Sequence, residues 1–194
     1  MTEIHSNSIS DQSGLPDSAT KASEIAFEGR VWDVICKTFE LNGDSLTREF
    51  IQHPGAVAVL AINEEDEVLL IQQFRAPVNE FLYEIPAGLL DPGDNSNLDA
   101  AKRELAEEAD YQAENWESLQ TFYTTPGSSS EVIEIFLASG LTKTNSVFDR
   151  RGEEMGMVPI WVSFQEVLES VLESRLKSPT LVLSILSLAA RRGS

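Results

Sequence analysis

The chain has 194 residues, of which 42% are hydrophobic and 24% are charged, a composition typical of a globular protein with one sizeable core. Its 32 Asp and Glu residues outnumber its 14 Lys and Arg residues, which gives a formal net charge of -18. Because such a charge repels polyanions, we expect neither nucleic acid nor an anionic membrane surface as a partner.

The cysteine content and the N-terminus indicate the compartment. Cys36 is the only cysteine, so the chain can form no internal disulfide and has no cysteine spacing typical of a zinc site. The N-terminus lacks the basic and apolar regions of a signal peptide. The longest apolar run, residues 56–62, is too short to cross a bilayer. We therefore expect a cytoplasmic protein without a membrane segment.

The N-terminal quarter divides into two parts. Residues 1–23 are rich in serine and poor in large apolar side chains, so we expect a disordered leader. Residues 31–39 and 47–51 carry β-branched and aromatic side chains on either side of an Asn-Gly turn, which predicts a hairpin. We therefore expect a small antiparallel β extension over residues 24–55, followed by one domain over residues 56–194.

The rest of the chain mixes strands and helices, which predicts an α/β fold. Apolar residues at three- and four-residue spacing predict a helix over 98–109, with its cap at 95–97. Apolar stripes at 162–172 and 181–188 predict two core-facing helices. Five segments carry the apolar runs of strands: 56–62, 67–74, 81–86, 118–123 and 132–138. We expect the first two to be central and to pair through the polar turn at 63–66.

The helix over 98–109 carries three carboxylates on one edge. Glu104 and Glu108 are four residues apart, and Glu107 lies three residues after Glu104, so the three side chains converge. One interpretation is a solvated acidic face with Lys102 and Arg103 as salt-bridge partners. The other is a site for a hard cation such as Mg²⁺, completed by phosphate oxygens.

The segment before the helix favours the cation site. Gly88, Asp94 and the run Arg-Glu-Leu-Ala-Glu-Glu at 103–108 resemble the Nudix box, the glycine-loop-helix signature of metal-dependent diphosphate hydrolases. The resemblance implies a Nudix α/β/α sandwich with a mixed sheet. Asp94 replaces the usual Glu, one extra residue precedes Arg103, and Asp110 replaces the usual glycine. Asp tolerates the left-handed conformation, so the last change is compatible with a helix end.

Other segments resemble one branch of the family, the bacterial ADP-ribose pyrophosphatases. The resemblance rests on residues 53–57, 73–78, 84–91 and 125–128, and on Pro126, which lies 15 residues beyond Tyr111. It implies hydrolysis of ADP-ribose to AMP and ribose 5-phosphate with Mg²⁺, or Mn²⁺, by a homodimer that exchanges its β extension. The alternatives are another nucleoside diphosphate sugar as substrate, or a sensor that binds such a ligand without turnover.

The resemblance also implies which residues hold the metal and which activates water. Glu104 and Glu108 would ligate Mg²⁺, with Glu107 and the Ala87 carbonyl as further ligands, and Arg103 would orient them through an ion pair. Metals neutralise the nonbridging oxygens of the diphosphate and lower the pKa of the attacking water. Three glutamates of two loops are candidates for the general base: Glu131, which we favour, and its rivals Glu153 and Glu154. We expect Glu134, on a strand, to face solvent.

The substrate contacts follow from the same resemblance. Arg75 would hold the diphosphate, although an arginine there could simply cap a strand. Trp32 would stack on the adenine, although an aromatic residue at this place is commonly core or dimer interface. Leu89 would lie beside the ribose. Three residues belong to a segment that crosses to the partner subunit in this family and lines its pocket: Arg48, Glu49 and His53.

Overall fold

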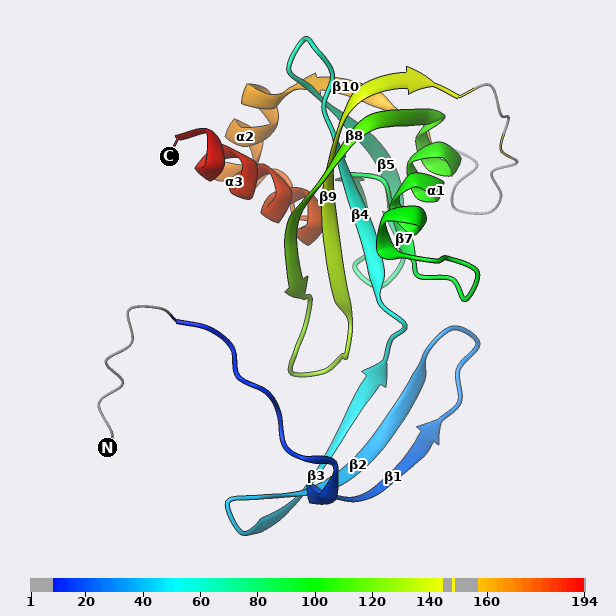
Figure 1. Ribbon diagram of the computed structural model, residues 1–194, viewed down its shortest axis with the longest axis vertical. Coiled ribbons are helices and arrows are strands. Elements are labelled where there is room, and N and C mark those ends of the chain that lie inside the picture. The colour runs from blue at the N-terminus through cyan, green and yellow to red at the C-terminus, as the bar shows by residue number, and fades with distance from the viewer. Residues whose placement is uncertain (1–8, 145–147, 149–156, 194) are drawn as a thin grey trace. The chain divides into compact units, whose positions relative to one another are not determined.

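A computed structural model describes residues 9–144, 148 and 157–193 (Figure 1). Glu153 and Glu154 lie outside these residues. The chain divides into two compact units, Met1–Gln52 and His53–Ser194, so the second unit begins three residues before the predicted boundary after residue 55. No helix of the described ranges is long and apolar enough to cross a membrane.

The first unit is a three-stranded antiparallel sheet with the order β1-β2-β3. Its elements are η1 (Asp17–Ala19), β1 (Thr20–Phe27), β2 (Asp33–Leu41) and β3 (Asp44–Gln52). The predicted hairpin is confirmed, because Asn42 and Gly43 both adopt a positive φ, of 55° and 89°, between β2 and β3. Trp32 lies in the connection before β2 rather than in a strand.

The predicted disordered leader is wrong for residues 17–23. Strand β1 begins at Thr20 and pairs along β2, with Ala22 opposite Thr38 and Ser23 opposite Lys37. Backbone hydrogen bonds to a neighbouring strand do not require apolar side chains, and most of β1 is exposed. The low apolar content of this segment therefore did not reveal the strand.

The second unit contains seven strands and three helices among its described residues. They are β4 (Ala56–Ala61), β5 (Glu67–Arg75), β6 (Glu80–Glu84), β7 (Ala87–Leu89), α1 (Asn97–Ala109), β8 (Tyr111–Tyr123), β9 (Val132–Lys143), β10 (Ile160–Ser163), α2 (Phe164–Leu172) and α3 (Pro179–Gly193). One sheet has the order β7-β4-β9-β8, and the other has the order β10-β5-β6. Because β4 and β9 run parallel while the other neighbours run antiparallel, the predicted mixed sheet is confirmed.

The predicted pairing of residues 56–62 with 67–74 is wrong. Strand β4 pairs with β7 and β9, whereas β5 pairs with β6 and β10. An isolated bridge joins Ile62 to Val68 between the two segments. Both strands are nevertheless central, as expected, because each has a hydrogen-bonded neighbour on both sides and both are largely buried.

Helices cover both faces of the four-stranded sheet, which makes an α/β/α sandwich (Figure 1). All of β4 is buried, and its side chains alternate between two cores. Val57, Val59 and Ala61 pack with Leu105 of α1. The other face packs on α2 and α3, with these residues in one cluster: Ala58, Leu60, Ile135, Val167, Leu181 and Ile185.

Helix α1 confirms the prediction over 98–109. Ser96 caps its start, because the Ser96 hydroxyl accepts a hydrogen bond from the Asp99 N–H at 3.1 Å. Asp110 ends it in the left-handed conformation, with φ 60° and ψ 33°, and its N–H reaches the Ala106 carbonyl. Aspartate therefore takes the position that the motif normally gives to glycine.

The stripe at 162–172 is only partly a helix. Val162 belongs to β10 and lies opposite Val68 of β5, while α2 begins at Phe164. Ser163 separates the two, since its hydroxyl accepts a hydrogen bond from the Glu166 N–H at 3.3 Å. The predicted helix at 181–188 is confirmed within α3.

Candidate active site

Strand β7 and helix α1 bring the motif carboxylates together. A Cβ on Gly88 would lie 1.9 Å from Oε1 of Glu104, so the Glu104 carboxylate occupies the space that any other residue at position 88 would fill. The Ala87 N–H donates a hydrogen bond to Oε2 of Glu108 at 2.8 Å. Both glutamates are only 8% exposed. Two buried carboxylates of the helix therefore lie against the backbone of β7.

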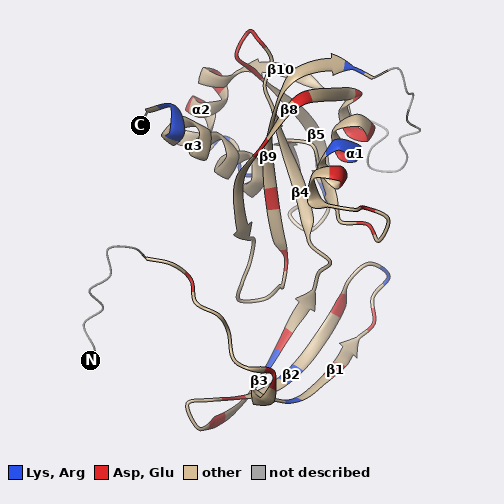
Figure 2. Ribbon diagram, viewed as in Figure 1, with Lys and Arg blue, Asp and Glu red and all other residues tan. Residues whose placement is uncertain are grey.

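Arg103 connects this helix to the loop before it. Its Nη2 donates to Asp94 at 3.0 Å and to the Leu89 carbonyl at 3.1 Å. Its Nη1 donates to Glu104 at 2.5 Å and to Glu107 at 3.3 Å. The ion pairs expected of Arg103 are therefore present, and they extend to the loop carboxylate. Figure 2 shows this concentration of charge on α1 and the loop before it.

The environment perturbs the ionisation of three of these groups. Burial raises the pKa of Glu104, although the neighbouring Arg103 opposes this. The hydrogen bond from Arg103 lowers the pKa of Asp94 below its ordinary value. The same hydrogen bond raises the pKa of Arg103. A cation beside Glu104 would therefore relieve an unfavourable buried charge.

The donor chemistry of this site fits a hard divalent cation, because all three helix side chains offer carboxylate oxygens. Glu107 is the most accessible of them, with a side chain 42% exposed. Across the described ranges, no three His, Cys, Asp or Glu side chains are grouped closely enough to hold a metal ion. Arg103 donates hydrogen bonds to both Glu104 and Glu107. A cation between those two side chains would therefore have to displace Arg103 from them. The role expected of the Ala87 carbonyl stays a prediction.

A second cluster forms around Glu131, at the end of the loop between β8 and β9. Oε1 of Glu131 lies 3.1 Å from Nε2 of His53, and Oε2 accepts a hydrogen bond from the Thr124 hydroxyl at 2.5 Å. The His53 side chain is 6% exposed and that of Glu131 is 25% exposed. His53 therefore contacts the candidate base within its own unit.

The two clusters meet the same end of the four-stranded sheet. Ala56 of β4 lies between Leu89 of β7 and Ile133 of β9 in the ladder. The Leu89 carbonyl accepts from Arg103, and Ile133 follows Glu131 by two residues. The structure therefore brings the loop glutamate and the helix motif to the same end of the sheet.

Glu84 is a partner of the candidate site residue Arg75 that the sequence did not reveal. Its buried carboxylate accepts two hydrogen bonds from Arg75, from Nε at 2.9 Å and from Nη2 at 2.7 Å. Arg75 is on β5 and Glu84 on β6, and Glu84 lies opposite Ile71, which shares a face with Arg75. This pair becomes visible only when the register of the two strands is known. In the sequence, the single Glu before Ile-Pro was only a weak indication of it.

Three further sequence predictions involve other parts of the fold. Arg48 and Glu49 are exposed neighbours on β3, so their side chains point to opposite faces of the first unit's sheet. Glu134 does not simply face solvent: its half-buried carboxylate accepts hydrogen bonds from Asn97 at 2.9 Å and from Ser118 at 2.7 Å. It thereby links β9 to the start of α1.

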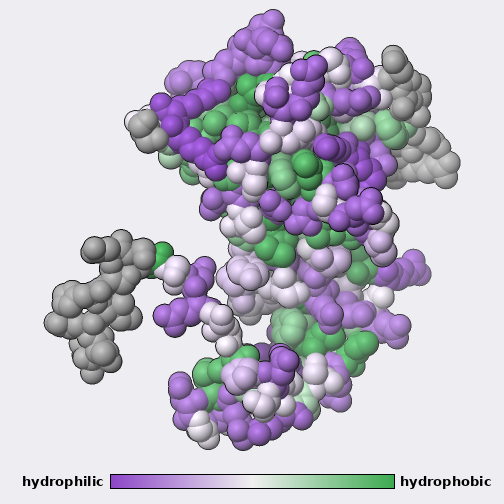
Figure 3. Space-filling view, in the orientation of Figure 1, coloured by the Kyte–Doolittle hydropathy of each residue, from purple (hydrophilic) through white to green (hydrophobic). Residues whose placement is uncertain are grey.

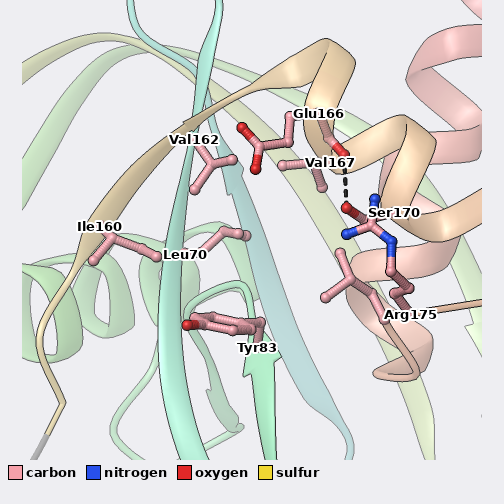
Figure 4. A pocket seen from close by; sticks show the side chains of 9 residues that line it. Leu70, Tyr83, Ile160, Val162, Glu166, Val167, Ser170 and Arg175 are labelled. Atoms are coloured by element: carbon pink, nitrogen blue, oxygen red, sulfur yellow. Dashed lines mark hydrogen bonds between the residues drawn. The ribbon is translucent and has the colours of Figure 1, made fainter.

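A cavity of about 210 Å³ lies elsewhere in the second unit, between β5, β6, β10 and α2 (Figure 4). Leu70, Val162 and Val167 form its apolar lining, with Tyr83 and Arg175 beside them. None of the predicted site residues lines this cavity. It is therefore separate from the two carboxylate clusters.

Comparison with known proteins identifies the class. The sequence profile of the NUDIX domain matches residues 52–181. A crystal structure of an ADP compounds hydrolase has a TM-score of 0.72 and 21% identity, over 88% of this chain and 91% of that one, which shows the fold alone. The chain belongs to the Nudix hydrolase family, and the predicted Nudix sandwich is confirmed. Divalent cations are the usual cofactors of this family.

Two curated relatives are similar over most of their length. The ADP-ribose pyrophosphatase of Bacillus subtilis is 38% identical over 159 residues, which cover 81% of this chain and 80% of that protein. The methanol dehydrogenase activator of Bacillus methanolicus is 35% identical over 172 residues, which cover 88% of this chain and 92% of that protein.

The pKa of Asp94 leads to a pH-dependent prediction. Because the folded pKa is lowered, Asp94 stabilises the fold above the ordinary aspartate pKa of 3.8, and this contribution is lost as the pH falls through the lowered value. We expect Asp94→Asn to lower the free energy of unfolding equally at pH 7 and pH 5, and less below pH 3.8. Urea unfolding across this range measures the difference. In an Arg103→Leu background the pH-dependent part should disappear; a difference that persists unchanged to pH 3 contradicts the assignment.

The contact between Gly88 and Glu104 leads to a second prediction. We expect Gly88→Ala to displace the Glu104 carboxylate and to weaken Mg²⁺ or Mn²⁺ binding about tenfold or more, as loss of ligand positioning does in other metal sites. Gly93→Ala is the matched control, because a Cβ there meets nothing within 4 Å. Isothermal titration with each metal measures the affinities. Equal affinities of the two variants would exclude Glu104 as a metal ligand whose position depends on the space left by Gly88.

Proposed function

We propose that the protein hydrolyses the pyrophosphate bond of ADP-ribose to AMP and ribose 5-phosphate, with Mg²⁺ as cofactor and Mn²⁺ as a substitute. The observation that carries this proposal is the pair of buried carboxylates of α1, Glu104 and Glu108, that lie against the backbone of β7. The name of the Bacillus subtilis relative supports ADP-ribose as the substrate. The residues that carry the family resemblance, at 53–57, 73–78, 84–91 and 125–128, support the same branch of the family.

The helix carboxylates prepare the site for the diphosphate. Glu104 and Glu108 present buried oxygens, and Glu107 adds an accessible one. These three side chains would hold Mg²⁺, which when bound would supply neutralisation of the nonbridging oxygens of the diphosphate and activation of water. Arg103 orients Glu104 and Glu107 through its ion pairs and keeps the loop with Asp94 beside the helix.

Glu131 is the proposed general base. Its side chain is 25% exposed, so water can reach a carboxylate that His53 and Thr124 orient. The rival residues Glu153 and Glu154 lie outside the described part of the chain.

Arg75 is the proposed contact for the diphosphate. Its side chain is 41% exposed, and the bidentate ion pair with buried Glu84 sets the direction of its guanidinium. The proposal includes three further kinds of substrate contact. Trp32 stacks on the adenine, Leu89 contacts the ribose, and Arg48 and Glu49 contact the substrate in the partner's pocket. The metal site reads only the diphosphate, so selectivity for the sugar depends on these contacts.

The test compares two glutamates of two helices. We expect Glu108→Gln to lower kcat for ADP-ribose about a thousandfold, because removal of a group that acts in the transition state costs several kcal/mol. Glu169→Gln, at an exposed glutamate of α2 that accepts a hydrogen bond from Gln165, should retain full activity. AMP release with Mg²⁺, followed by chromatography, measures both variants, and circular dichroism checks the fold.

The other substrate classes are outcomes of the same assay. Full activity of Glu108→Gln contradicts the metal assignment. If the wild-type chain cleaves GDP-mannose or UDP-glucose faster than ADP-ribose, the substrate is that nucleoside diphosphate sugar instead. Tight binding of ADP-ribose without any product, across several divalent metals, favours the sensor instead of the hydrolase.

We also propose a homodimer that exchanges the β extension. In the first unit, Ile25, Ile35 and Phe50 form an apolar row across three strands, and Phe27 lies on the other face. Ile25 is 56% exposed and Phe27 is 64% exposed, and Figure 3 shows such apolar surface on this unit. A three-stranded sheet cannot cover both of its own faces, so a second surface is required.

Light scattering of the full chain tests the dimer. We expect a mass twice the 21.4 kDa of one chain. Ile25→Glu places a charge in the apolar row and should shift the equilibrium toward single chains, whereas Glu24→Gln, at the preceding residue on the opposite face, should not. A single-chain mass at micromolar concentration contradicts the proposal.

A further inference from the structure

Parallel pairing brings two distant segments together at the start of β4 and β9. Ala56 lies opposite Ile133, so the residues that precede each strand emerge at the same edge of the sheet. The His53 N–H donates to the Ser130 hydroxyl at 2.9 Å. The segment that enters β4 is therefore attached to the loop that carries Glu131.

The main chain determines which nitrogen of His53 carries the proton. Nδ1 accepts a hydrogen bond from the Gly55 N–H at 3.0 Å, so in the neutral ring the proton lies on Nε2. Nε2 faces Oε1 of Glu131 at 3.1 Å and donates to it. Gly55 permits this arrangement, because its φ is +98° and a Cβ would lie 3.0 Å from Cδ1 of Leu90. The tautomer of His53 thus follows from the backbone of residues 53–55.

The Glu131 carboxylate is held at both oxygens. Oε1 accepts from His53, and Oε2 accepts from the Thr124 hydroxyl at 2.5 Å. The backbone of Glu131 is held too, since its N–H donates to the Ser129 hydroxyl at 3.1 Å and its carbonyl accepts from the Thr124 N–H at 3.3 Å. A glutamate held at both oxygens and both main-chain groups keeps one orientation.

We propose that His53 is a positioning residue for Glu131. The Nε2–H of a buried imidazole fixes the direction of the carboxylate, and the imidazole acts through Glu131 rather than through a contact with the substrate. This inference rests on the proposed function, in which Glu131 takes the proton of the attacking water. Loss of His53 frees Oε1, so the carboxylate turns about its last torsion and spends less time in the productive orientation.

Steady-state kinetics of the full chain test the inference. We expect His53→Leu to lower kcat for ADP-ribose about tenfold or more, with KM changed less than about threefold, because orientation of the base affects the chemical step. His53→Gln should recover most of kcat, because its amide N–H can occupy the place of the Nε2–H. In a Glu131→Gln background, His53→Leu should add less than about threefold, as expected for residues that act as a unit.

Nitrogen NMR of the imidazole provides a readout independent of activity. We expect the Nε2–H tautomer for His53 in the wild-type chain, and a shift of the Nε2 resonance in Glu131→Gln but not in Glu169→Gln. If the wild-type chain does not cleave ADP-ribose, the proposed function fails, while this measurement still tests the pair.

Three results overturn the inference. These are an unchanged kcat in His53→Leu, whether or not KM rises, a His53→Gln variant as slow as His53→Leu, and an Nδ1–H tautomer. A raised KM with kcat retained would return His53 to the substrate contacts implied by the family resemblance.

Discussion

The parallel pairing of β4 with β9 is the constraint on which the rest of the second unit depends. Strand β4 is buried along its whole length and carries two apolar faces, one for α1 and one for α2 and α3. A strand covered on both faces must have its backbone satisfied by neighbours, and β7 and β9 provide them. The same register places His53 beside the loop of Glu131 and Leu89 beside the helix motif.

Burial of carboxylates at the candidate site costs free energy. Glu104 is buried, and its pKa is raised because the ionised form loses solvation. Gly88 lets its carboxylate lie against the strand, and Arg103 offsets part of the cost with hydrogen bonds to Glu104 and Asp94. Such a site contributes less to the stability of the fold than an apolar cluster would, but its carboxylates are suited to binding a cation.

Hydrogen bonds to main-chain and side-chain groups determine the directions of the other polar residues. Gly55 sets the tautomer of His53, and Ser129 receives the N–H of Glu131. The buried Glu84 of β6 accepts two hydrogen bonds from Arg75 of the neighbouring strand β5. The Arg75–Glu84 pair joins β5 to β6, and the contact of His53 with Glu131 joins the segment before β4 to the loop before β9, so these contacts confer a single arrangement on separate elements.

The sequence by itself determined the local features: helix α1 with its carboxylates, the left-handed cap at Asp110, the Asn-Gly hairpin, and the family. These follow from residue type and short spacing. Only the tertiary structure decided that β4 and β5 belong to different sheets, that Val162 is in a strand, and that β1 exists. It also decided the contacts of His53 with Glu131 and of Arg75 with Glu84. Pairing depends on backbone groups that every residue carries, so side-chain pattern alone cannot select the partner strand.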